Sequence, residues 1–262
     1  MSNERFRLDG CTAFVSGAAG HLGRAMSRVL AEAGAHVILN GRREKRLQDF
    51  AAELQSAGYS CDSAAFDMAD FESVRGFFGS LKRLDVLVNN AIAMTPKPFA
   101  ALEPSDFAQT YMSSVTAAFE AARAALPALR QGVAATGEAR IVNIASMYAS
   151  VSPDKRIYAK PEQASPFHYG PAKAALLQLT RHLAAELAPE KIRVNALVPG
   201  PFPQPKVSED DAAFAARLAA KTMLGRLGRP EEIAGPLLFL ASPASSFVTG
   251  AALVVDGGWT AW

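Results

Sequence analysis

The sequence predicts an α/β protein in which one doubly wound, Rossmann-like parallel sheet forms a single domain. Short apolar runs alternate with longer helical stretches almost from end to end. These runs are continuously apolar, which is typical of strands buried on both faces of a parallel sheet. No break in composition and no internal repeat marks a second domain, and 262 residues suit one large α/β domain.

The expected strands are short and lie at regular intervals. They cover residues 13–15, 36–39, 64–66, 86–88, 141–144, 193–197 and 253–255. The clearest helices between them are expected over residues 21–33, 44–57, 105–130 and 167–187. The proline-rich stretch 199–205 is interpreted as a loop, because periodic structure resumes soon after it.

Composition excludes several classes of protein. The formal net charge is +2 and no basic block is present, so no nucleic-acid partner is expected. No run approaches the roughly 20 apolar residues that cross a bilayer, and the charged N-terminal segment lacks the apolar core of a signal peptide. Cys11 and Cys61 are interpreted as reduced thiols. We expect a soluble, cytoplasmic protein without a membrane partner or a bound metal.

A glycine-rich turn follows the first expected strand. Residues 16–23 read SGAAGHLG and lead into a helix. Glycines at such a turn let the backbone approach a pyrophosphate, and the unpaired N–H groups of the helix favour its negative charge. Any tight turn favours glycine, but the context of strand, turn, helix and strand favours a dinucleotide site. The candidate cofactor-binding residues here are Gly17, Gly20, His21, Leu22 and Gly23.

The end of the second expected strand indicates which dinucleotide is bound. An acidic residue there would hold the adenosine ribose of NAD, but residues 40–43 read NGRR. A guanidinium can bind a phosphate through two hydrogen bonds. Asn40, Arg42 and Arg43 therefore favour NADP. NAD stays possible, because both arginines could instead open a solvated helix.

The candidate catalytic residues are a tyrosine and a lysine four positions apart, together with a serine. Tyr169 and Lys173 would lie on one helix face. An ammonium nearby would lower the pKa of the phenol, which ordinarily titrates near 10, towards useful acid–base range. Ser146 ends an expected strand at the sheet edge where open α/β proteins bind ligands, and its hydroxyl could polarise a carbonyl.

These motifs resemble the short-chain dehydrogenase/reductases, in the single-domain branch that includes 3-oxoacyl-(acyl carrier protein) reductases and gluconate 5-dehydrogenases. The resemblance extends over nearly the whole chain, and further matching pieces are Asp67, residues 89–91, residues 193–195, Pro199-Gly200, residues 225–234 and residues 255–258. It implies that Ser146 positions a carbonyl, Tyr169 donates the proton and Lys173 serves both the phenol and the nicotinamide ribose. It also implies cofactor contacts from Asp67, Met68, Asn89, Ala91, Pro199 and Gly200.

The chain departs from the family pattern in four places. His21 stands where a glycine is usual, and Ile92 follows Ala91 where the family has glycine. Ser114 aligns with an asparagine that usually holds a relay water beside the lysine. Serine can still bind a water, so Ser114 is kept as a catalytic candidate. The stretch between Ser146 and Tyr169 is about ten residues longer than usual, which places an insertion at about residues 152–166.

The insertion and a loop at about residues 201–224 are expected to shape the substrate site. The alternative, that the insertion has no role in substrate binding, is equally supported by the sequence. Lys155 and Arg156 favour a sugar or keto acid as substrate, with a 3-oxoacyl thioester as the alternative. The expected reaction is reversible hydride transfer between the cofactor and a ketone or secondary alcohol. The alternative function, outside the enzymes, is a cofactor-binding scaffold or sensor that does not turn over a substrate.

The resemblance also implies a homotetramer. Helices 105–130 and 167–187 would pack across subunits, although their alanine-rich faces could equally cover the sheet. Trp259 and Trp262 make the C-terminal tail unusually aromatic. Since an exposed pair of tryptophans would be unusual, we expect them to dock on a neighbouring subunit or to close a substrate pocket.

Overall fold

The computed structural model describes residues 3–159 and 164–262. Among them, seven strands form one sheet in the order β3-β2-β1-β4-β5-β6-β7, and each neighbouring pair is parallel. The strands are β1 (Thr12–Val15), β2 (His36–Gly41), β3 (Cys61–Ala65), β4 (Val86–Asn89), β5 (Ala139–Ile144), β6 (Ile192–Pro199) and β7 (Ala252–Val255). The predicted parallel sheet is confirmed.

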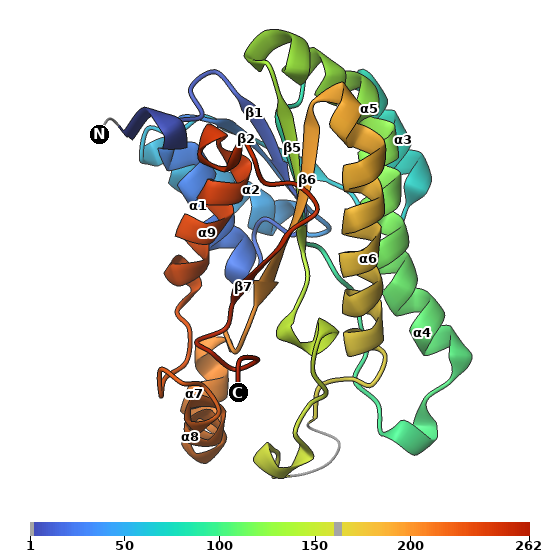
Figure 1. Ribbon diagram of the computed structural model, residues 1–262, viewed down its shortest axis with the longest axis vertical. Coiled ribbons are helices and arrows are strands. Elements are labelled where there is room, and N and C mark those ends of the chain that lie inside the picture. Colours follow the sequence, from blue (N-terminus) through green and yellow to red (C-terminus); the bar gives the residue numbers. More distant parts are fainter. Residues whose placement is uncertain (1–2, 160–163) are drawn as a thin grey trace.

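Helices cover both faces of the sheet (Figure 1). One face packs against α1 (His21–Glu32), α2 (Glu44–Ser56) and α9 (Ala234–Ala241). The other packs against α3 (Phe71–Ser80), α5 (Ala117–Thr136) and α6 (Tyr169–Leu187). The remaining α-helices are α4 (Pro104–Tyr111), α7 (Pro205–Asp210) and α8 (Ala212–Ala220). α7, α8 and the segment after β5 extend beyond the carboxyl ends of the strands (Figure 1).

Burial explains where the strand predictions succeeded and where one failed. Every residue of β5 and β6 is buried, although each of these mainly apolar strands also contains an arginine and an asparagine. β3 lies at the edge of the sheet, and Asp62 and Ser63 within it are exposed. Its start therefore carries no apolar pattern, and the predicted strand 64–66 began three residues too late.

Residues 104–136 are helical without a break, so the helix predicted over residues 105–130 is confirmed, although it is not α-helical throughout. A π-helical turn, Met112–Thr116, separates α4 from α5. Within it the Ser114 hydroxyl donates to the carbonyl oxygen of Thr110, four residues earlier, at 2.6 Å. Such bonds between a side chain and the preceding turn compete with the helix ladder. α5 also continues to Thr136, where Gly137 ends it in the left-handed region at φ 87°.

The proline-rich stretch contains less loop than expected. β6 extends to Pro199 and α7 already begins at Pro205. The predicted substrate loop at 201–224 is therefore largely helical, because α7 and α8 occupy most of it. Within the described residues, no helix combines the length and the apolar character that crossing a membrane requires.

Candidate active site

A groove opens beside the carboxyl ends of β1 and β4, where the strand order reverses. Open α/β sheets bind ligands at such a reversal. The groove encloses about 370 Å³. Predicted cofactor residues that line it are Gly17, Gly20, His21, Asn40, Arg42, Asp67, Met68 and Ala91. The fold thus gathers residues from six separate segments of the sequence around one elongated space.

The glycine turn has a geometry that other residues could not adopt. Gly17 has φ +65°, and a Cβ there would lie 2.9 Å from the Asn90 side-chain nitrogen. A Cβ on Gly23 would lie 2.1 Å from the Gly17 carbonyl oxygen. Gly20 is the N-cap of α1, so the unpaired N–H groups of that helix begin at the groove. Leu22, in the first turn of α1, instead packs against the hydrophobic core.

His21 is the first residue of α1 and lines the groove. Its Nε2 atom is buried and has no hydrogen-bond partner among the described residues. An unsatisfied ring nitrogen in a protein interior is costly. His21 therefore presents a vacant hydrogen-bonding position at the end of the groove where a phosphate would meet the helix.

Asn40 and Arg42 differ in what they offer a ligand. Asn40 is fully buried, and its side-chain nitrogen donates to the carbonyl oxygens of Ala64 and Phe66 at 3.0 and 3.2 Å. Asn40 therefore links β2 to β3 and its neighbouring segment. The Arg42 guanidinium is 63% exposed at the groove and lies 3.6 Å from the Asp67 carboxylate. It is free to turn towards an anionic group.

Eight of the predicted cofactor residues lie outside the lining of this groove: Leu22, Gly23, Arg43, Asn89, Tyr169, Lys173, Pro199 and Gly200. Arg43 caps the start of α2. Pro199 ends β6. Asn89 is buried at the end of β4, where its side-chain nitrogen donates to Asn143 Oδ1 at 2.9 Å. Asn143 in turn donates to Thr180 Oγ1 of α6 at 2.9 Å, so a buried chain of polar side chains joins β4, β5 and α6.

Ser146 and Tyr169 line a second cavity, of about 630 Å³, beside the groove. Ser146 follows β5, and Tyr169 is the first residue of α6. Lys173 lies one helical turn later and is only 3% exposed. Its Nζ donates to the Ile144 carbonyl oxygen at 2.6 Å and lies 5.7 Å from the centre of the Tyr169 ring. The structure thus brings the three predicted catalytic side chains together.

Burial governs the protonation of this group. It raises the pKa of the Tyr169 phenol, and a hydrogen bond with Ser146 only partly opposes this. The net direction is thus opposite to the lowering that was expected from Lys173. Burial also lowers the pKa of Lys173 to about 8. The phenol accordingly stays protonated at neutral pH, which is the state that can donate a proton.

Ser114 lies in the π-helical turn, which packs against α6. Its hydroxyl is buried and donates to Thr110, as described above. The hydroxyl proton is therefore engaged, and the oxygen has only lone pairs to offer a water. The structure gives Ser114 a narrower role than an asparagine amide could have, because an amide both donates and accepts.

Two buried residues near the site escaped sequence reasoning. The Ser113 hydroxyl lines the groove and accepts from the N–H of Ala93 at 3.1 Å. His168 is fully buried, with Nδ1 3.0 Å from Thr110 Oγ1 and Nε2 3.3 Å from the Thr95 carbonyl oxygen. Both residues hold the loop after β4 against the helices. Neither belongs to a sequence pattern that could have identified it.

Uncharged side chains line the cavity at Ser146. They are Met94, Pro96, Met147, Tyr148, Tyr158, Ala164, Ser165, Pro166, Gly200, Pro201, Phe202, Pro203, Phe214 and Leu218. Lys155 lines a neighbouring cavity of about 530 Å³ instead. Arg156 is exposed and forms an ion pair with Asp154 at 2.8 Å. Residues 160–163 of the predicted insertion lie outside the described residues.

The C-terminal tail packs beside the cavity that contains Ser146 and Tyr169. Trp259 is buried against Met147, Ile157 and Leu218. Trp262 is 72% exposed, although its indole N–H donates to the Lys221 carbonyl oxygen at 3.2 Å. Trp259 therefore packs against Met147 and Leu218 of the cavity wall within its own chain, but neither tryptophan lines the cavity itself.

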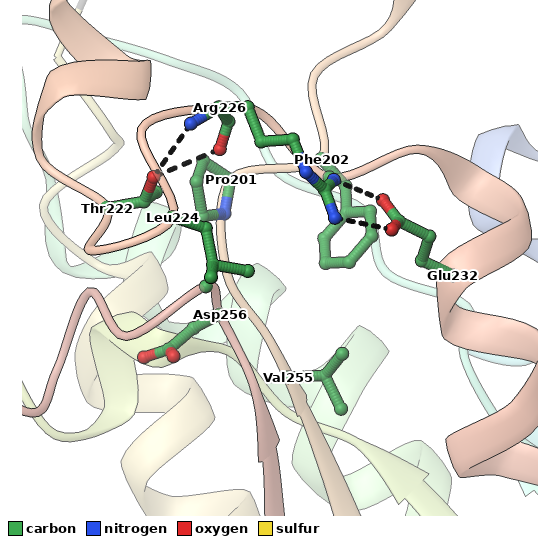
Figure 2. A pocket seen from close by; sticks show the side chains of 10 residues that line it. Pro201, Phe202, Thr222, Leu224, Arg226, Glu232, Val255 and Asp256 are labelled. Atoms are coloured by element: carbon green, nitrogen blue, oxygen red, sulfur yellow. Dashed lines mark hydrogen bonds and ion pairs between the residues drawn. The ribbon is translucent and has the colours of Figure 1, made fainter.

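A small hollow of about 90 Å³ behind residues 201–202 shows how the end of the substrate loop is held (Figure 2). Arg226 forms two hydrogen bonds to the Glu232 carboxylate, at 2.7 and 2.8 Å. Thr222 Oγ1 donates to the Arg226 carbonyl oxygen and accepts from its N–H. Figure 2 shows these contacts around Phe202, and they give the family-like stretch 225–234 a structural role.

Comparison with known proteins agrees with this geometry. A family profile described as enoyl-(acyl carrier protein) reductase matches residues 17–260. The rhamnolipid-biosynthesis 3-oxoacyl-(acyl carrier protein) reductase of Pseudomonas aeruginosa is 36% identical, over 97% of this chain and 98% of its own. The chain is a short-chain dehydrogenase/reductase.

Further relatives of this chain act on other kinds of substrate. The cis-4-hydroxycyclohexanecarboxylate dehydrogenase of Sinomonas cyclohexanicum is 38% identical, over 95% of this chain and 96% of its own. The gluconate 5-dehydrogenase of Burkholderia cenocepacia, solved in complex with NADP and tartrate, has a TM-score of 0.86 and 34% identity. It covers 99% of this short-chain dehydrogenase/reductase and 98% of its own chain. The family is thus shared while the substrates differ.

Proposed function

We propose that this protein reduces a ketone to a secondary alcohol, reversibly, with NADP(H) as cofactor. One observation carries the proposal: Ser146 and Tyr169 line a single cavity, with the buried Lys173 ammonium directly behind them. A cavity of this size beside a dinucleotide-shaped groove has room for a small carbonyl compound.

The groove fits a dinucleotide. Gly17, Gly20 and Gly23 keep the turn free of side chains, and His21 offers its unpartnered Nε2. Arg42, exposed at the end of β2, would bind the 2′-phosphate of NADP. The NADP complex of the related gluconate 5-dehydrogenase supports the same choice. NAD remains the second candidate.

Each catalytic side chain has a role that its surroundings support. When bound, the nicotinamide supplies or accepts a hydride. The Ser146 hydroxyl donates a hydrogen bond to the substrate oxygen and orients it. Tyr169, protonated because burial raises its pKa, gives its proton to that oxygen as the alcohol forms.

Lys173 and Ser114 would support the return of the proton. The Lys173 ammonium favours the phenolate that Tyr169 becomes after donation, because the charges attract in a buried site. Lys173 would also hold the nicotinamide ribose. We propose that Ser114 accepts a hydrogen bond from a water beside Lys173, since its own proton is already given to Thr110.

The uncharged cavity favours an uncharged substrate. Because Arg156 is paired with Asp154 and does not line the cavity, the basic insertion gives little support to an anionic sugar acid. Apolar walls instead favour the second candidate, a 3-oxoacyl ester or thioester, and the related Pseudomonas aeruginosa reductase carries that substrate class in its name.

The test follows absorbance at 340 nm with NADPH, then NADH, against keto sugars, keto acids, 3-oxoacyl esters and cyclic ketones. Tyr169→Phe is the control. We expect turnover with NADPH and an uncharged ketone, lost in the variant. Tight NADPH binding without turnover on any compound would favour a silent scaffold, to which His21, Ile92 and Ser114 point.

We propose a cytoplasmic homotetramer as the assembled form. Phe119 on α5 and Val254 on the edge strand β7 are exposed, at 44% and 47%. Large exposed apolar side chains of this kind are typical of contact surfaces. Sedimentation at micromolar concentration should give four times the 27.7 kDa chain mass, and a monomer would contradict the assembly.

A further inference from the structure

Two tyrosine hydroxyl groups meet in the wall of the substrate cavity. Tyr148 Oη lies 2.9 Å from Tyr158 Oη, and both residues line the cavity with Ser146 and Tyr169. One hydroxyl donates to the other, so the accepting one keeps its own proton. Neither hydroxyl has another side-chain hydrogen-bond partner among the described residues. One O–H group is thus left to donate to a ligand.

The pair is held rigidly by α8. Arg217 Nε donates to the Ile157 carbonyl oxygen at 2.6 Å. The Tyr158 ring lies 5.3 Å from the Phe214 ring, tilted by 37°. The segment is therefore anchored to α8 at Ile157 and at the Tyr158 ring. A donor on such a support is positioned before a substrate arrives.

The surroundings limit what the pair can bind. No charged side chain lines the cavity among the described residues, so a carboxylate would enter without a counter-ion. Burial, together with the neighbouring Tyr158, raises the pKa of Tyr148, so this phenol remains a neutral donor. Its sequence position, two residues after Ser146, places it next to the group that would hold the reacting carbonyl.

We propose that Tyr148 and Tyr158 form a specificity site for a second, uncharged acceptor oxygen of the substrate, the ester or thioester carbonyl of a 3-oxoacyl compound. This inference rests on the proposed carbonyl reduction at Ser146 and Tyr169. An oxygen two carbons from the ketone would accept the spare phenolic proton while the ketone lies at Ser146. A ketone without that oxygen would leave this half-buried donor unpaired.

The test compares ethyl 3-oxohexanoate with nonan-4-one, which has a chain of the same length and the ketone at the same distance from the short end. NADPH oxidation is followed for the wild type, Tyr148→Phe and Tyr158→Phe. Tyr59→Phe, a tyrosine packed near α2 on the opposite face of the sheet, is the matched control. Circular dichroism and NADPH fluorescence confirm that each variant folds and binds cofactor.

We expect the wild type to prefer the oxoester and each phenylalanine variant at the pair to lower its kcat/KM by about 2- to 12-fold. The rate with nonan-4-one and the Tyr59→Phe control should not change. Equal loss on both ketones, or no loss on either, would overturn the specificity site while carbonyl reduction stands. No wild-type turnover of either ketone would overturn both.

Discussion

Replacing Lys173 with methionine measures what the buried ammonium costs the fold. Lys173 is only 3% exposed, and burial lowers the pKa of its ammonium from 10.5 to about 8. At about 1.36 kcal/mol per pH unit, this difference amounts to about 3 kcal/mol of lost folding stability at neutral pH. Methionine removes that cost but also removes the hydrogen bond to Ile144, worth about 1 kcal/mol. The variant should therefore be about 2 kcal/mol more stable at pH 7.

The sign of the pH dependence follows from the lowered pKa. The folded chain holds the lysine proton less tightly than the unfolded chain does, so the cost is fully present below about pH 8. It declines as the pH rises and is gone above about pH 10.5. The stability advantage of Lys173→Met should thus shrink by about 2 kcal/mol between pH 7 and pH 9.5.

Urea denaturation followed by tryptophan fluorescence measures these differences at both pH values. Lys82→Met, at an exposed position, is the control and should change little with pH. Catalysis should be lost in the Lys173 variant although its fold is stabilised. A Lys173→Met variant that is destabilised equally at pH 7 and pH 9.5 would refute the reasoning, because burial of the charge would then cost nothing.

Three further substitutions test other parts of the site. Gly23→Ala should abolish NADPH binding, measured by fluorescence, because the new Cβ would lie 2.1 Å from the Gly17 carbonyl oxygen. The control variant Gly76→Ala, with open space around the new Cβ, should bind NADPH normally. Arg42→Ala should raise the Kd for NADPH about tenfold and leave the Kd for NADH unchanged, as measured by calorimetry. Equal changes in the two Kd values would contradict the proposed contact between Arg42 and the 2′-phosphate. Asn143→Ala should lower the free energy of unfolding by about 1–3 kcal/mol, because two buried polar partners lose their hydrogen bonds; an unchanged urea midpoint would contradict this.

The parts of the fold that the sequence predicted are those with local causes. Strands buried on both faces are mainly apolar, so β5 and β6 were recognisable although each contains an arginine and an asparagine. The turn at Gly17 and Gly23 was recognisable because backbone geometry there excludes any other side chain. Tyr169 and Lys173 were recognisable because four residues make one helical turn.

What the sequence could not predict depends on neighbours that are distant along the chain. The raised pKa of Tyr169 comes from burial, which outweighs the hydrogen bond with Ser146. The Tyr148–Tyr158 pair joins two residues that share no pattern. Arg156 looked available for an anionic substrate, but Asp154 pairs with it in the folded protein. Each needed three-dimensional contacts that composition and spacing do not encode.

The most direct test of the central claim follows the hydride itself. The wild type and Tyr169→Phe are incubated with NADPH carrying deuterium at both C4 positions and with ethyl 3-oxohexanoate, and the product alcohol is examined by mass spectrometry and NMR. The proposed function predicts one deuterium on the carbinol carbon with the wild type, and at least about 100-fold less product with the variant. Undiminished labelled product from Tyr169→Phe, or no deuterium in the wild-type product, would contradict it.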